Sequence, residues 1–143
     1  MKGVLGNIFA LNIGGQTIHS WSGITPTTDL NNKNLFILKV RNNNKLSNKW
    51  KFIKVLIIDE ISMLTDKILD FIDEVAKIIR DTDKPFGGIQ VVITGDFLQL
   101  PPVSKDISKP FAFKANCWEN LIDYTILLKK CYRQNEIELV TFL

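Results

Sequence analysis

The 143-residue chain has a single histidine, His19, and only two cysteines, Cys117 and Cys131. The two cysteines are too far apart for a Cys-x-x-Cys motif, and one histidine does not complete any of the common zinc sites. We therefore expect no zinc centre. Both cysteines are expected to be free thiols in a reducing compartment.

Long apolar runs are also missing from the sequence. No stretch approaches the roughly 18 unbroken apolar residues of a membrane span. The apolar N-terminal stretch is interrupted by Asn7 and Asn12 and has no small-x-small cleavage site after it, which argues against a signal peptide. We expect a soluble, intracellular protein without membrane contact. The net charge of +3 permits an anionic partner but specifies none.

Two short apolar runs predict parallel β-strands. Residues 55–58 (VLII) are typical of a strand that is covered on both faces, and residues 89–94 (IQVVIT) predict a second buried strand. Between them, apolar residues at spacings of three and four predict an amphipathic helix over residues 65–81, with Thr65 as its N-cap. Strand, helix and strand in this order predict a parallel βαβ unit, and hence an open α/β sheet.

The segment before this unit is rich in asparagine and lysine. Residues 31–49 are compatible with a helix that has loop ends, or with a surface excursion. The chain shows no internal repeat, and its length indicates one domain or a part of one.

The segment after the unit predicts further regular elements. The pair Asn116 and Glu119 and the pair Asn135 and Glu138 each resemble a capping box that opens a helix. Between the pairs, residues 124–128 (YTILL) predict a third strand. The C-terminal part should therefore run helix, strand, loop, helix.

Polar and charged side chains follow each predicted strand. Asp59 and Glu60 follow the first strand, Asp96 and Gln99 the second, and Arg133 the third. In open α/β sheets ligands bind beyond the carboxyl ends of the strands, so these side chains should converge on one crevice. A strand that ends in Asp-Glu is typical of nucleotide hydrolases, in which one carboxylate holds magnesium and the other activates a water.

Each of these residues also has an ordinary structural explanation. Acids often end a strand in solvent, Asp96 fits a turn, Gln99 fits a loop amide and Arg133 fits an exposed surface. Pro101 and Pro102 fit a strand terminator. Because such polar and charged residues recur at the ends of successive strands, a functional site is the favoured interpretation.

Four motifs resemble those of the PIF (petite integration frequency) family of superfamily-one DNA helicases. They are GGQTIHSWSGI (14–24), VLIIDEISML (55–64), DKPFGGIQVVITGDFLQLPPV (83–103) and LLKKCYRQ (127–134). They occur in the family's order over nearly the whole chain. The third is the most specific, and the Asn/Lys-rich segment is the least matched. The resemblance implies a RecA-like α/β fold of the P-loop NTPase type, with an open parallel sheet and flanking helices.

The resemblance also implies a role for each residue at the strand ends. Asp59 would coordinate Mg²⁺, and Glu60 would activate the water that attacks the γ-phosphate of ATP. Gln99 would sense that phosphate and link hydrolysis to DNA contacts, and Arg133 would bind it as an arginine finger. Asp96 would belong to the same nucleotide-binding set.

Thr17, His19 and Ser20 would lie along a single-stranded DNA track. Members of the family are ATP-dependent helicases that translocate from five-prime to three-prime and unwind duplex DNA in repair, recombination and telomere maintenance. The ligands implied are therefore ATP, Mg²⁺ and single-stranded and duplex DNA. The motor would work as a monomer, in the nucleus or mitochondrion of a eukaryote.

The sequence departs from the family in one respect that bears on activity. It contains no Gly-Lys pair, so the family's phosphate-binding loop is not among these residues. The stretch at residues 5–9 also differs from the family's Thr-Gly and small residues. We expect residues 1–143 to be an incomplete first motor domain, inactive alone, without the phosphate-loop unit and the second motor domain. A degenerate, non-catalytic DNA- or partner-binding module is the alternative.

Overall fold

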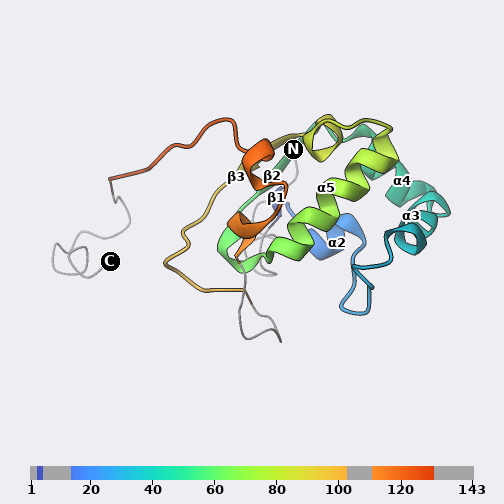
Figure 1. The fold of residues 1–143 in the computed structure, drawn as a ribbon, viewed down its shortest axis with the longest axis horizontal. Helices are drawn as coiled ribbons and strands as arrows, with labels where there is room; N and C mark the ends of the chain where they lie inside the picture. The colour runs from blue at the N-terminus through green and yellow to red at the C-terminus, as the bar shows by residue number, and fades with distance from the viewer. Residues whose placement is uncertain (1–2, 5–13, 103–110, 131–143) are drawn as a thin grey trace.

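The computed structural model describes residues 3–4, 14–102 and 111–130, and within them the centre of the fold is a parallel sheet. The strands β1 (Gly3–Val4), β2 (Val55–Ile58) and β3 (Gln90–Ile93) lie in the order β1-β2-β3, as Figure 1 shows. The register pairs Val55 with Gln90 and Ile58 with Ile93. The predicted α/β class and parallel βαβ unit are confirmed.

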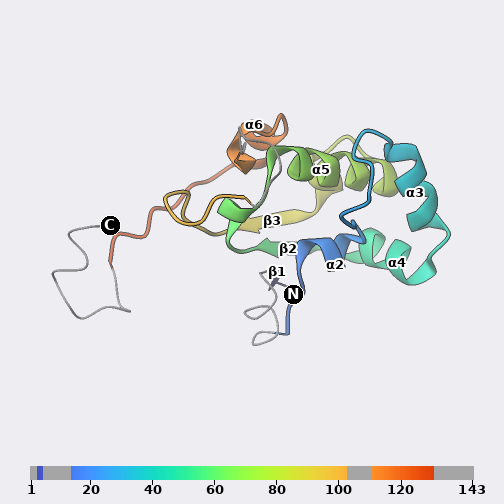
Figure 2. The same ribbon diagram turned by 90° about the horizontal axis from the view of Figure 1, so that it is seen from below.

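The helix between β2 and β3 is α5 (Asp66–Arg80), which lies along one face of the sheet (Figure 2). Its N-cap is Thr65, whose side-chain oxygen accepts a hydrogen bond from the Ile68 amide at 3.4 Å. Buried apolar residues recur along it at spacings of mainly three and four: Leu69, Phe71, Ile72, Val75, Ala76 and Ile79. The predicted helix and its cap are thus confirmed.

Only one face of β2 is fully covered within the described residues. Leu56 and Ile58 are buried, whereas Ile57 is half-buried and its neighbour on β3, Val92, is 42% exposed. The expectation that these strands are buried on both faces is therefore wrong for this part of the chain. A continuous apolar run shows that a strand is apolar on both sides, but it does not say what lies against each side.

The Asn/Lys-rich segment forms two helices, α3 (Lys33–Arg41) and α4 (Asn44–Phe52), instead of one helix with loop ends. Asn32 and Asn43 are their N-caps, and the side chains accept hydrogen bonds from the amides of Leu35 and Leu46. Asparagine binds nearby backbone groups with its side chain and so favours caps over helix interiors. The asparagines therefore divide the segment.

A pair of tryptophans joins α4 to the short helix α2 (Ile18–Ser22). The rings of Trp21 and Trp50 are fully buried, with centroids 4.7 Å apart. The Trp50 indole also donates a hydrogen bond to the Ser22 carbonyl at 3.1 Å. This contact fixes α2 beside α4, and Figure 2 shows the two helices as neighbours.

The predicted third strand is wrong, because residues 124–130 have no regular secondary structure. The apolar side chains of Tyr124, Ile126, Leu127 and Leu128 are largely exposed. The local sequence has strand propensity, but a strand also needs a partner, and no described strand pairs with this segment.

The capping box at Asn116 is also wrong. The helix α6 (Trp118–Leu121) begins after Cys117, and the Asn116 side chain donates instead to the Asp70 carboxylate at 2.8 Å. A tertiary contact thus replaces the local one. The predicted pair Asn135 and Glu138 lies outside the described residues, as does Cys131.

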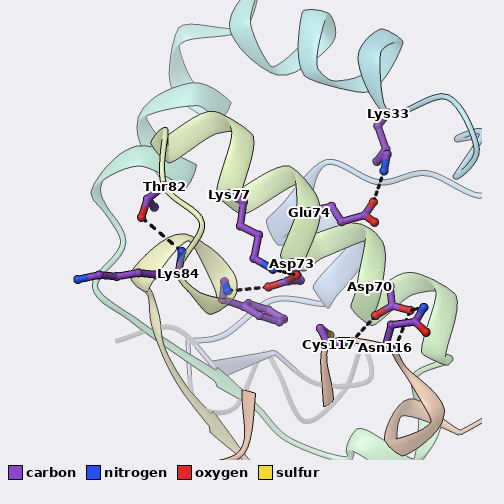
Figure 3. A network of polar contacts seen from close by, with 10 residues as sticks. Lys33, Asp70, Asp73, Glu74, Lys77, Thr82, Lys84, Asn116 and Cys117 are labelled. Atoms are coloured by element: carbon purple, nitrogen blue, oxygen red, sulfur yellow. Dashed lines mark hydrogen bonds and ion pairs between the residues drawn. The ribbon is translucent and has the colours of Figure 1, made fainter. Parts of the chain in front are cut away.

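Carboxylates on α5 hold two other segments in place (Figure 3). Asp73 is 3% exposed and accepts hydrogen bonds from the Phe86 amide at 2.7 Å and from the Lys77 ammonium at 2.6 Å. The hydrogen bond to Asp73 raises the pKa of Lys77. Asp70 accepts hydrogen bonds from the amides of Asn116 and Cys117 at 3.0 and 2.9 Å. Burial raises the pKa of the free Cys117 thiol, which keeps it protonated.

The turn η2 (Pro85–Gly88) leads into β3 and lies directly against α5. Gly87 has φ +61°, and a Cβ there would lie 2.6 Å from the Ala76 carbonyl oxygen. The Arg80 guanidinium donates to the Gly87 carbonyl at 2.6 Å and to the Lys51 carbonyl at 2.7 Å. The start of β3 is therefore fixed by α5 and by the segment that precedes β2.

Replacing Asp73 by Ala should lower the free energy of unfolding of the 143-residue chain by about 2 to 3 kcal/mol, because it leaves the buried Phe86 amide without an acceptor. Glu74→Ala is the matched control on the same helix. It removes an ion pair with Lys33 whose side chains are 38% and 45% exposed, so it should cost about 0.2 to 1 kcal/mol. Urea denaturation measures both. Equal losses for the two variants would contradict the role of Asp73.

Candidate functional site

The carboxyl end of β2 carries the two adjacent acids, Asp59 and Glu60. The Oδ1 atom of Asp59 accepts hydrogen bonds from the Glu60 amide at 3.0 Å and from the hydroxyl of Thr94. Thr94 directly follows β3, so the Asp59 carboxylate is oriented by the neighbouring strand. Both acids are half-buried.

Glu60 has a left-handed backbone, with φ +54° and ψ +48°. Residues other than glycine adopt this conformation uncommonly, and it costs of the order of 1 kcal/mol or more. The short helix η1 (Ile61–Met63) follows immediately. The chain therefore turns sharply at Glu60, and such strained positions cluster at functional sites.

The loops after β2 and β3 are joined through their backbones. The Ile61 amide donates to the Thr94 carbonyl at 3.0 Å, and the Thr94 amide donates to the Ile58 carbonyl at 2.9 Å. Gly95 has φ +150°, and a Cβ there would lie 2.9 Å from the Ile61 nitrogen. Glycine at this position lets the two loops approach closely.

Asp96 and Gln99 lie in the loop after Gly95. The Asp96 side chain accepts hydrogen bonds from the Leu98 amide at 2.9 Å and from the Gln99 amide group at 3.4 Å. The Gln99 backbone amide also donates to the Asp96 carbonyl at 3.1 Å. Asp96 is thus a turn residue, as one of the sequence interpretations holds, and it also contacts the Gln99 side chain.

An aromatic cluster anchors this exposed loop. Leu98 is 87% exposed, but Phe97 beside it makes edge-to-face contacts with Phe111, Phe113 and Trp118 at centroid distances of 5.7, 4.9 and 6.1 Å. Pro102 at the far end of the loop is fully buried. The loop is therefore held at both ends, while Gln99 remains exposed between them.

The three predicted DNA-binding residues lie at α2. Thr17 is the N-cap, and its hydroxyl accepts a hydrogen bond from the Ser20 amide at 3.1 Å. His19 and Ser20 are exposed on the helix. Among the hydrogen bonds of the described residues, none joins α2 to Asp59, Glu60, Asp96 or Gln99. The described hydrogen bonds thus join the loops after β2 and β3 to each other but not to α2.

The donor set at Asp59 fits Mg²⁺ that arrives with a nucleotide. In residues 3–4, 14–102 and 111–130, no group of three or more His, Cys, Asp or Glu side chains could hold a metal ion. Mg²⁺ usually keeps several waters and is held by one or two carboxylates together with substrate phosphates. A single oriented carboxylate is compatible with this way of binding the ion, in which phosphates and waters supply the other ligands. Arg133, the predicted arginine finger, lies outside the described residues.

The sequence profile of the family described as PIF1-like helicase matches residues 6–141. The chain belongs to the PIF1-like helicase family. The PIF1-like chain is 44% identical over 140 residues to the ATP-dependent DNA helicase RRM3 of Saccharomyces cerevisiae, covering 94% of this chain and 19% of the relative. It is 35% identical over 141 residues to human ATP-dependent DNA helicase PIF1, covering 95% of this chain and 21% of the relative.

Solved Pif1 structures share the fold of this PIF1-like chain. The Pif1 helicase of Candida albicans superimposes with a TM-score of 0.86 at 39% identity, over 97% of this chain and 31% of that one. The Bacteroides Pif1 complex with ADP-AlF3 and ssDNA gives a TM-score of 0.78 at 34% identity, over 99% and 34%. The chain thus spans about a fifth of these two curated relatives and about a third of these two crystallised chains. The resemblance inferred from the motifs is confirmed.

Thr94 is the site residue that the sequence did not reveal. Its hydroxyl contacts the Asp59 carboxylate, 35 residues earlier in the chain. Its place at the end of a predicted strand next to Gly95 is a signal, but only the strand register places it beside Asp59.

None of the helices in the described segments is both long and apolar enough to cross a membrane.

Gly95→Ala should destabilise the PIF1-like chain more than Gly88→Ala, by a margin of about 1 kcal/mol or more, because the new methyl group would press on the Ile61 backbone. Gly88 has φ +73°, but a Cβ added there would make only an ordinary van der Waals contact, with the Lys84 side chain at 3.7 Å. The control variant therefore loses stability only because alanine is unfavourable in the Gly88 backbone conformation. Urea denaturation compares the two, and an equal or smaller loss for Gly95→Ala would show that the loops are not in close contact.

Proposed function

We propose that this chain is part of the first motor domain of an ATP-dependent DNA helicase. The parent would couple ATP hydrolysis to five-prime to three-prime translocation on single-stranded DNA and to duplex unwinding. The observation that carries the proposal is the junction of the Asp59–Glu60 and Asp96–Gln99 loops at the carboxyl end of the sheet, in a PIF1-like chain. A Bacteroides relative was crystallised with ADP-AlF3 and ssDNA.

In this proposal Asp59 holds Mg²⁺ and Glu60 acts as the general base. Two donors, the Glu60 amide and the Thr94 hydroxyl, fix Oδ1 of Asp59, and no described residue donates a hydrogen bond to Oδ2. Bound Mg²⁺ would neutralise charge on the phosphates. The backbone turns at Glu60 through a left-handed conformation directly after Asp59. In this proposal the two acids serve metal and water separately.

Gln99 would sense the γ-phosphate. In the structure its side-chain amide donates to the Asp96 carboxylate at 3.4 Å, a long hydrogen bond that a phosphate oxygen can replace. Asp96 would therefore hold Gln99 in place until nucleotide binds. Arg133 would stabilise the transferred phosphoryl group as an arginine finger, a role worth about 10³ to 10⁵ in rate in enzymes that use one.

Thr17, His19 and Ser20 would contact single-stranded DNA, and the parent would act in repair, recombination and telomere maintenance. The phosphate-binding loop and the second motor domain would come from parts of the parent protein outside these 143 residues. We expect the parent to translocate as a monomer. One related structure is described as DNA unwinding at forked dsDNA by two coordinating Pif1 helicases, so the stoichiometry on forked DNA needs its own measurement.

A chimera tests this function. Residues 14–130 replace the matching segment of the Candida albicans Pif1 helicase, a fold match with a TM-score of 0.86. The chimera should hydrolyse ATP when single-stranded DNA is added, and Glu60→Gln in the chimera should reduce the rate at least about 100-fold, as expected for loss of a general base.

The variant also separates the two candidate functions. A chimera that folds and binds nucleotide but has no more turnover than its Glu60→Gln version would contradict the helicase proposal, and would support a degenerate binding module instead. Thermal unfolding with and without ADP and Mg²⁺ shows whether each chimera is folded and binds nucleotide.

A further inference from the structure

The positive charge of the chain is concentrated in residues 14–54. This segment has seven lysines and arginines but a single acidic residue, Asp29, whereas the whole chain has a net charge of only +3. It contains α2, α3 and α4, and thus the Asn/Lys-rich segment to which the proposed function gives no role. A clustered basic surface is the electrostatic footprint of nucleic-acid binding.

Two of these lysines reach α2, where the proposed DNA-binding residues lie. The Lys49 ammonium on α4 is 3.4 Å from the Gln16 side-chain oxygen and 3.4 Å from the Ser20 carbonyl oxygen. The Lys39 ammonium on α3 is 3.1 Å from the Gly23 carbonyl oxygen. The carbonyl group carries no formal charge, so this contact positions the Lys39 ammonium without neutralising it.

The exposed side of α4 combines positive charge with an aromatic ring. Lys45, Lys49 and Phe52 are spaced by four and three residues, so they share one side of the helix, away from the buried Leu46 and Trp50. Phe52 is 73% exposed. Lysines beside an exposed aromatic ring suit single-stranded nucleic acid, in which the lysines hold the backbone and a base stacks on the ring.

We propose that Lys39, Lys45, Lys49 and Phe52 form a second contact for single-stranded DNA, which continues the track from α2 onto α3 and α4. The inference rests on the proposed function, because the track begins at Thr17, His19 and Ser20. The three lysines bind successive phosphates, and Phe52 stacks on one base. The Asn/Lys-rich segment is then part of the DNA-binding surface.

Fluorescence anisotropy of labelled oligo(dT) with the 143-residue chain, over a series of salt concentrations, tests the contact. Lys45→Gln/Lys49→Gln should reduce the slope of log affinity against log salt by about 1.4, since each phosphate contact on a single strand contributes about 0.7. Phe52→Ala should weaken binding about fivefold or more and leave the slope unchanged. Lys84→Gln/Lys114→Gln removes the same charge outside α2 to α4 and should leave the slope as in the wild type.

Several outcomes would overturn the proposal. The first is an unchanged salt slope in Lys45→Gln/Lys49→Gln, or an equal reduction of the slope in the control pair Lys84→Gln/Lys114→Gln. The second is the absence of oligo(dT) binding by the wild-type chain at the lowest salt. The third is a Phe52→Ala variant that loses as much affinity for a blunt duplex as for oligo(dT). Loss of binding in His19→Ala/Ser20→Ala, with no effect of the lysine pair, would overturn this contact and leave the proposed function intact. Thermal melts monitored by circular dichroism should show all variants folded.

Discussion

One backbone hydrogen bond, from the Ile61 amide to the Thr94 carbonyl oxygen, holds together the two loops on which the proposed chemistry depends. It extends the pairing of β2 and β3 past the last registered pair, Ile58 and Ile93. The acidic pair and the Asp96–Gln99 loop therefore leave the sheet as neighbours. The close approach at Gly95 and the left-handed turn at Glu60 follow from the same junction. The site is thus arranged mainly by backbone geometry.

Helix α5 supports this junction from both ends of β3. Before the strand, the Asp73 carboxylate accepts a hydrogen bond from the Phe86 amide, and the Arg80 guanidinium donates one to the Gly87 carbonyl. After the strand, Asp70 holds the segment at Asn116 and Cys117, and the neighbouring Trp118 contacts Phe97 in the loop. The helix that connects the two strands in sequence therefore also fixes where the second strand begins and where its loop lies.

Local patterns in the sequence predicted the elements that depend on local physics. The apolar periodicity and Thr65 gave the correct helix and cap, and the two apolar runs gave the parallel strands. The predictions that were wrong concern segments whose structure depends on contacts with residues distant in sequence. Asn116 binds Asp70 instead of capping a helix, and the YTILL segment has strand propensity but no described partner. Thr94 reaches Asp59 only through the strand register. The chemical roles of the site residues, including Arg133, remain predictions.

Amide hydrogen exchange at Ile61, followed by NMR in the 143-residue chain, tests the central junction most directly. If the junction is as described, the Ile61 amide exchanges as slowly as the Thr94 amide, which is bonded to the Ile58 carbonyl in the same ladder. Exchange at Ile61 as fast as at Thr27, in an exposed loop, would contradict the account, because the two loops would then not be held together.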